Sequence, residues 1–183
     1  MKTEPLREDF PKGFQDFEYV RSVNGAERNL ILVLHGFGGR KDPFLSLPQK
    51  LQLPMTSFLI FNALNELPKE LLDDPPGYFW FDDEEDDDDE DGLLQCLEAF
   101  KEALRALRRC GWRFEEISLL GHGQGGTVAL AAAEPLNAVV AVAAEARRRG
   151  TAPALLIDEQ RFPQRGQGFL RGGHKEENGL KIN

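Results

Sequence analysis

The stretch SLLGHGQGGT, residues 118–127, decides how the rest of the sequence is interpreted. Apolar residues lead into a cluster of glycines, and a second run of small and apolar residues follows directly. The first run is typical of the end of a buried strand, and the second is typical of the start of a helix. The stretch therefore predicts a strand that passes into a helix through one tight turn.

Two known glycine patterns fit this turn. GHGQG, residues 121–125, has the spacing of the G-x-S-x-G turn of serine hydrolases, with glycine at the tip in place of serine. Gly121, Gly123 and Gly126 also match the G-x-G-x-x-G turn that binds the pyrophosphate of a dinucleotide. The turn by itself leaves both interpretations open.

The dinucleotide interpretation finds local support further along the chain. Glu145 follows the next predicted strand, about 20 residues on, where an acidic residue contacts a ribose hydroxyl. The arginines at 147–149 could accept the 2′-phosphate of NADP. Against this hypothesis, the turn lies in the middle of the chain, after at least three predicted strands. Too few residues follow Glu145 for a complete second nucleotide-binding half.

The order of the predicted elements defines a fold class. Strand-like and helix-like segments alternate from Phe17 onward, which predicts a doubly wound, mostly parallel α/β sheet in a single domain spanning residues 1–183. Ligands bind such sheets at the carboxyl ends of the strands. Strands are predicted at 17–23, 30–36, 57–64, 115–122, 137–145 and 152–158, a possible short strand at 166–170, and helices at 42–51, 92–110 and 126–134.

The charge distribution and the cysteine content indicate which binding partners and which cellular compartment to expect. The net charge of −9 is concentrated in residues 82–91, which are all acidic and predict a solvated loop that would repel nucleic acid. Cys96 and Cys110 lie too far apart on one predicted helix to form a disulfide, which is typical of a reducing cytoplasm. No apolar segment long enough to span a membrane is present, and the scattered histidines and cysteines predict neither a metal nor another cofactor.

A second glycine turn favours the hydrolase interpretation. LVLHGFGG, residues 32–39, ends a buried strand, so that its backbone N–H groups can point at a reacting carbonyl. Together with YFWFDD (78–83) and LLGHGQGGTVAL (119–130), this motif resembles the phospholipase/carboxylesterase group of α/β-hydrolases, which includes acyl-protein thioesterases. The resemblance covers roughly residues 29–145. It implies hydrolysis of a small-molecule or lipidated-protein acyl ester or thioester by a Ser-Asp-His triad.

The resemblance also assigns residue roles. It carries the nucleophile position onto Gly123 and the oxyanion-hole N–H donors onto Phe37 and Gln124. Asp158, after a predicted strand, and His174, near the end of the chain, are the candidate acid and base, in the chain order of this fold. His35 is interpreted as a residue that structures its turn.

The sequence departs from this family at the tip of the turn. Glycine has no side chain at position 123, so no acyl-enzyme can form, and the chain is expected to be catalytically impaired. A non-catalytic acyl- or protein-binding relative is the main alternative, and NAD(P) binding is another. The chain stops where this fold would still need a strand and a covering helix. We therefore expect a fold truncated at its C-terminus, with an exposed strand edge that favours self-association.

Overall fold

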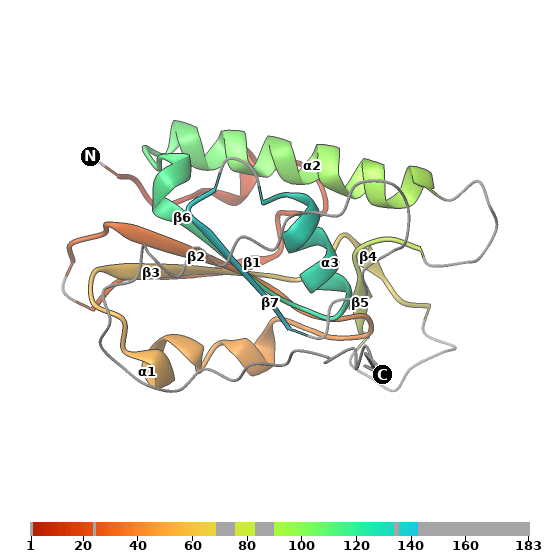
Figure 1. Ribbon diagram of the computed structural model, residues 1–183, viewed down its shortest axis with the longest axis horizontal. Coiled ribbons are helices and arrows are strands. Elements are labelled where there is room, and N and C mark those ends of the chain that lie inside the picture. Colours follow the sequence, from red (N-terminus) through yellow and green to blue (C-terminus); the bar gives the residue numbers. More distant parts are fainter. Residues whose placement is uncertain (1, 24, 69–75, 83–89, 134–135, 143–183) are drawn as a thin grey trace, which may run out of the picture.

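The computed structural model describes residues 2–23, 25–68, 76–82, 90–133 and 136–142 (Figure 1). A five-stranded sheet has the order β1-β3-β2-β6-β7, and β1 is antiparallel to β3 while the other neighbours are parallel. The mostly parallel sheet predicted from the sequence is therefore confirmed. Its strands are β1 (Phe17–Val20), β2 (Asn29–Leu34), β3 (Thr56–Phe61), β6 (Ile117–His122) and β7 (Ala138–Val142).

Helices cover both faces of this sheet, as a doubly wound fold requires (Figure 1). The long helix α2 (Glu90–Arg109) and the short helix α3 (Gln124–Ala131) pack on one face. Helix α1 (Leu47–Leu51) and the 3-10 turn Asp42–Phe44 cover the other face. The predicted strands at 152–158 and 166–170 lie outside the described residues.

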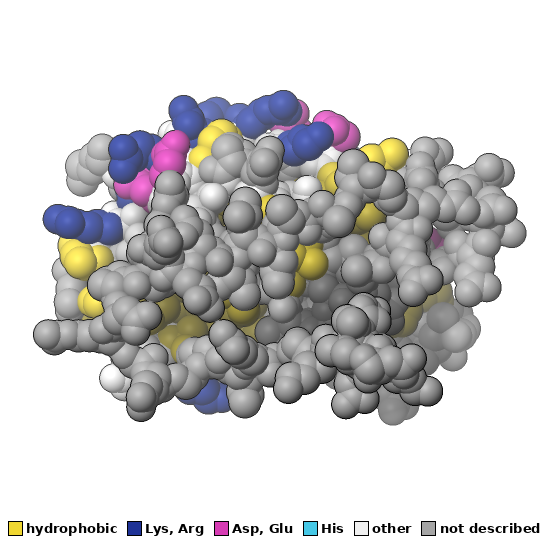
Figure 2. All heavy atoms as spheres, viewed as in Figure 1, with side chains coloured by type: hydrophobic (Ala, Val, Ile, Leu, Met, Phe, Trp, Pro, Cys, Tyr) yellow, Lys and Arg dark blue, Asp and Glu magenta, His cyan; other side chains and the backbone are white. Residues whose placement is uncertain are grey.

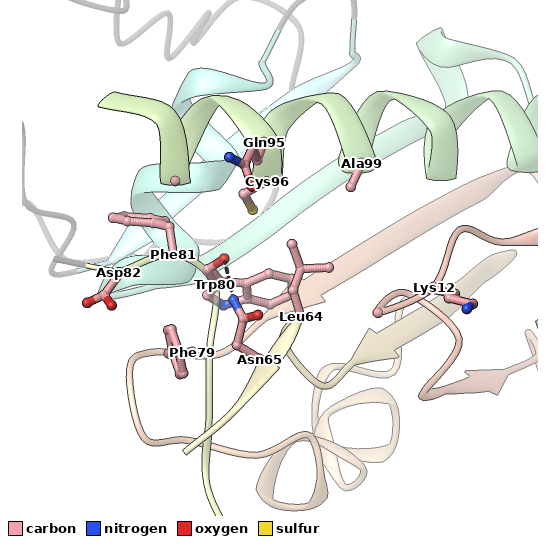
Figure 3. Close-up of a pocket in the computed structure, with 12 residues that line it drawn as sticks. Lys12, Leu64, Asn65, Phe79, Trp80, Phe81, Asp82, Gln95, Cys96 and Ala99 are labelled. Carbon is pink, nitrogen blue, oxygen red and sulfur yellow. Dashed lines mark hydrogen bonds between the residues drawn. The ribbon is translucent and has the colours of Figure 1, made fainter. Parts of the chain in front are cut away.

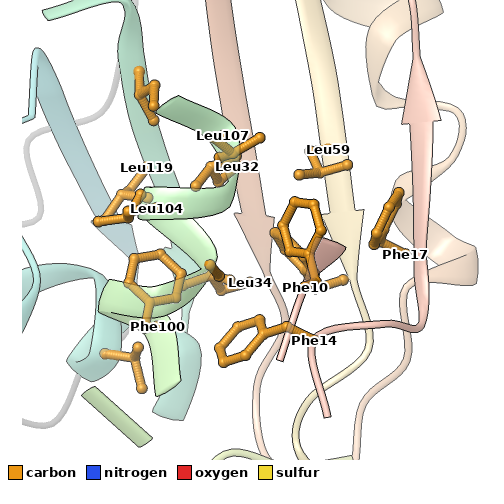
Figure 4. Close-up of a cluster of buried hydrophobic side chains, with 14 of the residues drawn as sticks. Phe10, Phe14, Phe17, Leu32, Leu34, Leu59, Phe100, Leu104, Leu107 and Leu119 are labelled. Carbon is orange, nitrogen blue, oxygen red and sulfur yellow. The ribbon is translucent and has the colours of Figure 1, made fainter. Parts of the chain in front are cut away.

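The alternation of side chains along β2 builds one core on each side of the sheet. Leu30, Leu32 and Leu34 point toward α2, whereas Val33 points toward α1. The apolar stripe of α2 completes the larger core, where Phe100, Leu104 and Leu107 are buried (Figure 4). The helix predicted at 92–110 has this stripe because its apolar residues recur every three or four positions.

The N-terminal segment contributes more to the core than its charged, proline-interrupted sequence indicates. Phe10 and Phe14 are buried, and the Phe14 ring lies 5.4 Å from that of Phe61 and 5.5 Å from that of Phe100 (Figure 4). These aromatic contacts attach the segment to both the sheet and α2. The segment that precedes β1 is therefore itself packed against the core.

Helix α2 begins two residues earlier than the sequence predicts and ends close to the predicted position. It begins at Glu90, so the last two residues of the acidic run belong to the helix and not to a loop; acidic residues favour a helix N-terminus. It is followed by Gly111, whose φ of +90° and N–H bond to the Arg108 carbonyl end the helix. Lys, Arg, Asp and Glu side chains line its outer side (Figure 2), where Lys101 pairs with Glu98.

The region between the predicted strand at 57–64 and the predicted helix at 92–110 contains a small second sheet. β4 (Asn65–Glu66) and β5 (Tyr78–Phe79) form an antiparallel pair. Two-residue strands are too short to produce an alternating pattern, so the sequence offered no signal for them. Among the described residues, no helix is both long and apolar enough to cross a membrane.

Candidate active site

The strand-to-helix turn at Gly123 is as tight as the sequence predicted. β6 ends at His122 and α3 begins at Gln124, so the chain reverses at one residue. Gly123 has φ +52° and ψ −125°, and its carbonyl oxygen accepts hydrogen bonds from the N–H groups of Gly126 (2.9 Å) and Thr127 (3.1 Å). Residues that carry a side chain rarely adopt this backbone conformation, whereas glycine adopts it without strain.

The three glycines of this turn have different physical roles. A Cβ atom at position 121 would lie 2.3 Å from the carbonyl oxygen of Gly125, and one at position 125 would lie 2.4 Å from that of His35. Neither position therefore has space for a side chain, and only glycine fits at either. A Cβ atom at position 123 would lie 3.4 Å from the Cα of Gly36, which is an ordinary contact. The tip has space for a side chain, and that side chain would face Gly36.

The second glycine turn, residues 35–39, lies directly against the first. β2 and β6 are neighbouring parallel strands with Leu34 opposite Gly121, so the segments after them meet at the same edge of the sheet. The Nδ1 atom of His122 lies 3.0 Å from the Cβ position of Gly36. Two motifs far apart in the sequence thus form one backbone surface.

His35 holds the 35–39 turn in one orientation. Its side chain is buried, its Nε2 accepts a hydrogen bond from the Ala63 N–H (3.0 Å), and its Nδ1 therefore carries the proton that it donates to the Gly36 carbonyl oxygen (2.7 Å). Burial lowers the pKa of His35, which keeps the imidazole neutral. With both ring nitrogens engaged, His35 structures the turn, as the sequence predicted.

This bond pattern also sets the direction of the Phe37 amide. The Gly36 carbonyl oxygen accepts from His35 and from the Gly39 N–H (3.0 Å) on the inner side of the turn. The peptide unit that joins Gly36 to Phe37 is planar and trans, so the Phe37 N–H points opposite to that oxygen. The N–H is directed away from the inner side of the turn.

A third segment, residues 78–82, packs behind both turns. The backbone N–H of Trp80 donates to the side-chain oxygen of Gln124 (2.8 Å), and the side-chain amide of Gln124 donates to the Phe81 carbonyl oxygen (2.6 Å). The Trp80 indole N–H donates to the His35 carbonyl oxygen (2.7 Å). Sequence reasoning used only the backbone of Gln124 and missed this role of its side chain, because its partners are distant in the sequence.

Aromatic side chains stand beside the turns. Phe37 is 60% exposed, although the backbone around it is closely packed, and its ring lies 6.0 Å from that of Phe79. Hydrogen bonds from Gly38 N–H to the Tyr78 carbonyl (2.9 Å) and from Tyr78 N–H to the Gly39 carbonyl (3.0 Å) join β5 to the turn. The turn thus presents apolar surface on its outer side.

A cavity of about 560 Å³ lies between α2 and the β4–β5 pair (Figure 3). Trp80, Phe81 and Leu64 line its apolar part, whereas Asn65 and Gln95 contribute amides. The Cys96 thiol at its wall is no candidate nucleophile, because burial raises its pKa to about 12. Cys96 and Cys110 are both free thiols, which confirms that they do not pair.

The structure brings together three of the predicted site residues, Gly123, Gln124 and Phe37, at one edge of the sheet. Asp158 and His174 lie outside the described residues, as does Glu145, on which the dinucleotide interpretation relied. Within the described part of the chain, no group of three or more His, Cys, Asp or Glu side chains could hold a metal ion.

The sheet order, the covering helices and the glycine turn after β6 define an α/β-hydrolase fold. Residues 15–147 match the phospholipase/carboxylesterase family, and the chain belongs to this family. The resemblance drawn from the three motifs is thereby confirmed.

Individual relatives agree with this assignment. An uncharacterised hydrolase of Mycosarcoma maydis is 29% identical over 144 residues, which are 70% of this chain and 53% of the relative. The Bacillus cereus carboxylesterase has the same fold, with a TM-score of 0.56 and 17% identity over 74% of this chain and 63% of that one. Esterase PE8 has a TM-score of 0.52 and 25% identity, covering 68% and 61%. The chain spans about half the length of the curated relative and under two thirds of these structures.

Proposed function

We propose that this chain carries an acyl-binding site of the carboxylesterase/thioesterase type and that Gly123 leaves it catalytically impaired. The observation that carries the proposal is the contact between the two glycine turns: the tip at position 123 faces Gly36, and the next peptide presents the Phe37 N–H outward. An acyl carbonyl placed between them would meet N–H groups from both turns. This is the arrangement of an oxyanion hole.

The roles of the individual residues follow from this arrangement. The N–H groups of Phe37 and Gln124 would stabilise the oxygen of the acyl group, with α3 beginning at Gln124. A serine at position 123 would attack the carbonyl carbon, His174 would accept the serine proton, and Asp158 would orient His174. Without the serine hydroxyl, no acyl-enzyme can form. Loss of a triad nucleophile lowers turnover by about 10⁶.

The unmodified chain, with glycine at position 123, would then bind acyl groups without cleaving them. The exposed Phe37 beside Phe79 offers apolar contact to an acyl chain, which favours esters or thioesters of fatty acids, free or on a lipidated protein. The buried, unpaired thiols of Cys96 and Cys110 support a reducing compartment such as the cytoplasm.

Restoring the hydroxyl tests this proposal. Gly123→Ser should hydrolyse a short-chain aryl ester and react with a fluorophosphonate probe, whereas the natural chain should do neither. Gly123→Ala is the matched control, because it introduces the same backbone strain without a nucleophile. A folded Gly123→Ser variant that remains inactive and unlabelled would show that more than the nucleophile is missing. Saturable binding of a fatty-acyl analogue by the natural chain would then support a binding role alone.

A further inference from the structure

We propose that the side chain of Gln124 is a positioning residue that sets the relative placement of the two oxyanion-hole turns, and that it acts through Trp80. The inference rests on the proposed function and deepens it. Gln124 would serve the site twice: its backbone N–H as one donor, and its side chain as the support of the turn that carries the other donor.

The first link joins the Gly123 turn to residues 78–82. Gln124 is 8% exposed, and both ends of its amide are bonded: the oxygen accepts from the Trp80 N–H and the nitrogen donates to the Phe81 carbonyl. Only a side chain with one acceptor and one donor at this length satisfies both backbone groups. Because the partners are buried, leaving either one unpaired is unfavourable.

The second link joins Trp80 to the 35–39 turn. The fully buried indole donates its N–H to the His35 carbonyl, and its ring lies 5.5 Å from the His35 imidazole. His35 is 1% exposed and holds the Gly36 carbonyl through Nδ1. That carbonyl belongs to the peptide whose N–H is the Phe37 donor.

The links form one continuous chain of contacts, which we name the Gln124 clasp: the buried side chains of Gln124, Trp80 and His35, and the Gly36–Phe37 peptide. The Ala63 N–H bond to His35 Nε2 anchors the clasp to the segment after β3. A shift of the Gln124 side chain would move Trp80, and Trp80 would move the His35 carbonyl. When the N–H donors of an oxyanion hole are misplaced, stabilisation of the transition state falls more than binding of the ground state.

Kinetics in the Gly123→Ser background test the clasp. Gln124→Met keeps the length of the side chain and removes both hydrogen bonds, whereas Gln124→Glu keeps only the acceptor for Trp80. We expect Gln124→Met to lower kcat by about 10–100-fold with KM nearly unchanged, somewhat less than the loss of a donor itself. Gln124→Glu should show a fall in the same direction, and it serves as the second variant if Gln124→Met does not fold.

Ser57→Ala is the matched control. Ser57 is a buried polar residue bonded to Glu27 (2.7 Å) and to the Ser22 N–H (3.1 Å), and it lies near the start of β3, far along the strand from the site. Its loss should lower stability and leave kcat unchanged. An unchanged kcat in folded Gln124 variants, or an equal fall in Ser57→Ala, would overturn the clasp.

Hydrogen exchange separates the clasp from the proposed function, because it needs no activity. In the natural chain, Gln124→Met should speed exchange of the Trp80 indole N–H and the Ala63 N–H at least about tenfold relative to Ser57→Ala. Unchanged protection at both protons would refute the clasp even if Gly123→Ser is active. Faster exchange combined with an inactive Gly123→Ser variant would support the clasp as a structural device and refute the proposed function.

Discussion

Glycine is favoured at position 121, near the end of β6, and at position 123, in the turn that follows, but for different reasons. At position 121 the constraint is space, since a Cβ atom would lie 2.3 Å from backbone oxygen; at position 123 the constraint is the backbone conformation, with φ +52°. Both the hydrolase and the dinucleotide pattern include positions 121 and 123, so the sequence pattern hides this difference. The structure separates the two effects and makes each measurable.

We expect Gly123→Ala to lower the free energy of unfolding by about 1–3 kcal/mol, through backbone strain alone. Gly121→Ala should lower it by about 3 kcal/mol or more, because backbone must move to relieve the clash. Gly25→Ala is a control for strain without crowding, since Gly25 has φ +67° and open space around its Cβ position. Urea denaturation of the three variants gives the values, and equal losses for Gly121→Ala and Gly123→Ala would contradict the packing described here.

Residue-level prediction from the sequence succeeded where the signal was local. The tight turn at Gly123 and the structuring role of His35 followed from glycine spacing and strand ends. The side-chain role of Gln124 and the indole bond of Trp80 did not, because each depends on a partner more than 40 positions away that only the folded chain brings near. Long-range hydrogen bonds leave no periodic signature in one sequence.

The 35–39 turn should respond to pH through His35. Burial holds the folded pKa of His35 below its unfolded value of about 6.5, so the unfolded chain binds the proton first as the pH falls. The stabilisation is fully present above the unfolded pKa. It is lost progressively below it, and the loss levels off once the pH is below the folded pKa.

Urea midpoints between pH 8 and pH 5 should therefore decline toward the acidic end for the natural chain. His35→Gln removes the titrating group and should flatten this decline, at the expense of lower stability throughout. His122→Gln, at the exposed end of β6, should retain the decline of the natural chain. The same slope in His35→Gln as in the natural chain would contradict the buried, neutral His35.

Among the elements, those with a helical period or a continuous apolar run were predicted, and the shortest ones were not. Helix α2 lies where its periodicity placed it, and β2, β3 and β6 lie where apolar runs placed them, within a few residues. The β4–β5 pair was missed because it is short, and the sequence offered no signal that Phe10 and Phe14, among many charged residues, enter the core. Two isolated aromatic residues form no pattern until the core that receives them is known.

At the scale of the whole molecule, the placement of the 35–39 turn disfavours dinucleotide binding. In the G-x-G-x-x-G arrangement the pyrophosphate lies in front of the helix N-terminus. Here Gly36 is at contact distance from the Cβ position of Gly123, so backbone occupies part of that space. Neither NADH nor NADPH at millimolar concentration should raise the Tm, whereas a fatty-acyl analogue should raise it with increasing concentration. A rise in Tm with NADH or NADPH, and none with the acyl analogue, would favour dinucleotide binding over acyl binding.

If the site binds acyl groups as proposed, glycine at position 123 would separate ligand binding from turnover. A ligand bound between the two turns would leave chemically unchanged, so the occupancy of the site would depend on affinity and free concentration and not on a reaction cycle. Occupancy would then report how much ligand surrounds the protein. In an enzyme that consumes its ligand, the occupancy of the site would also depend on the rate of turnover.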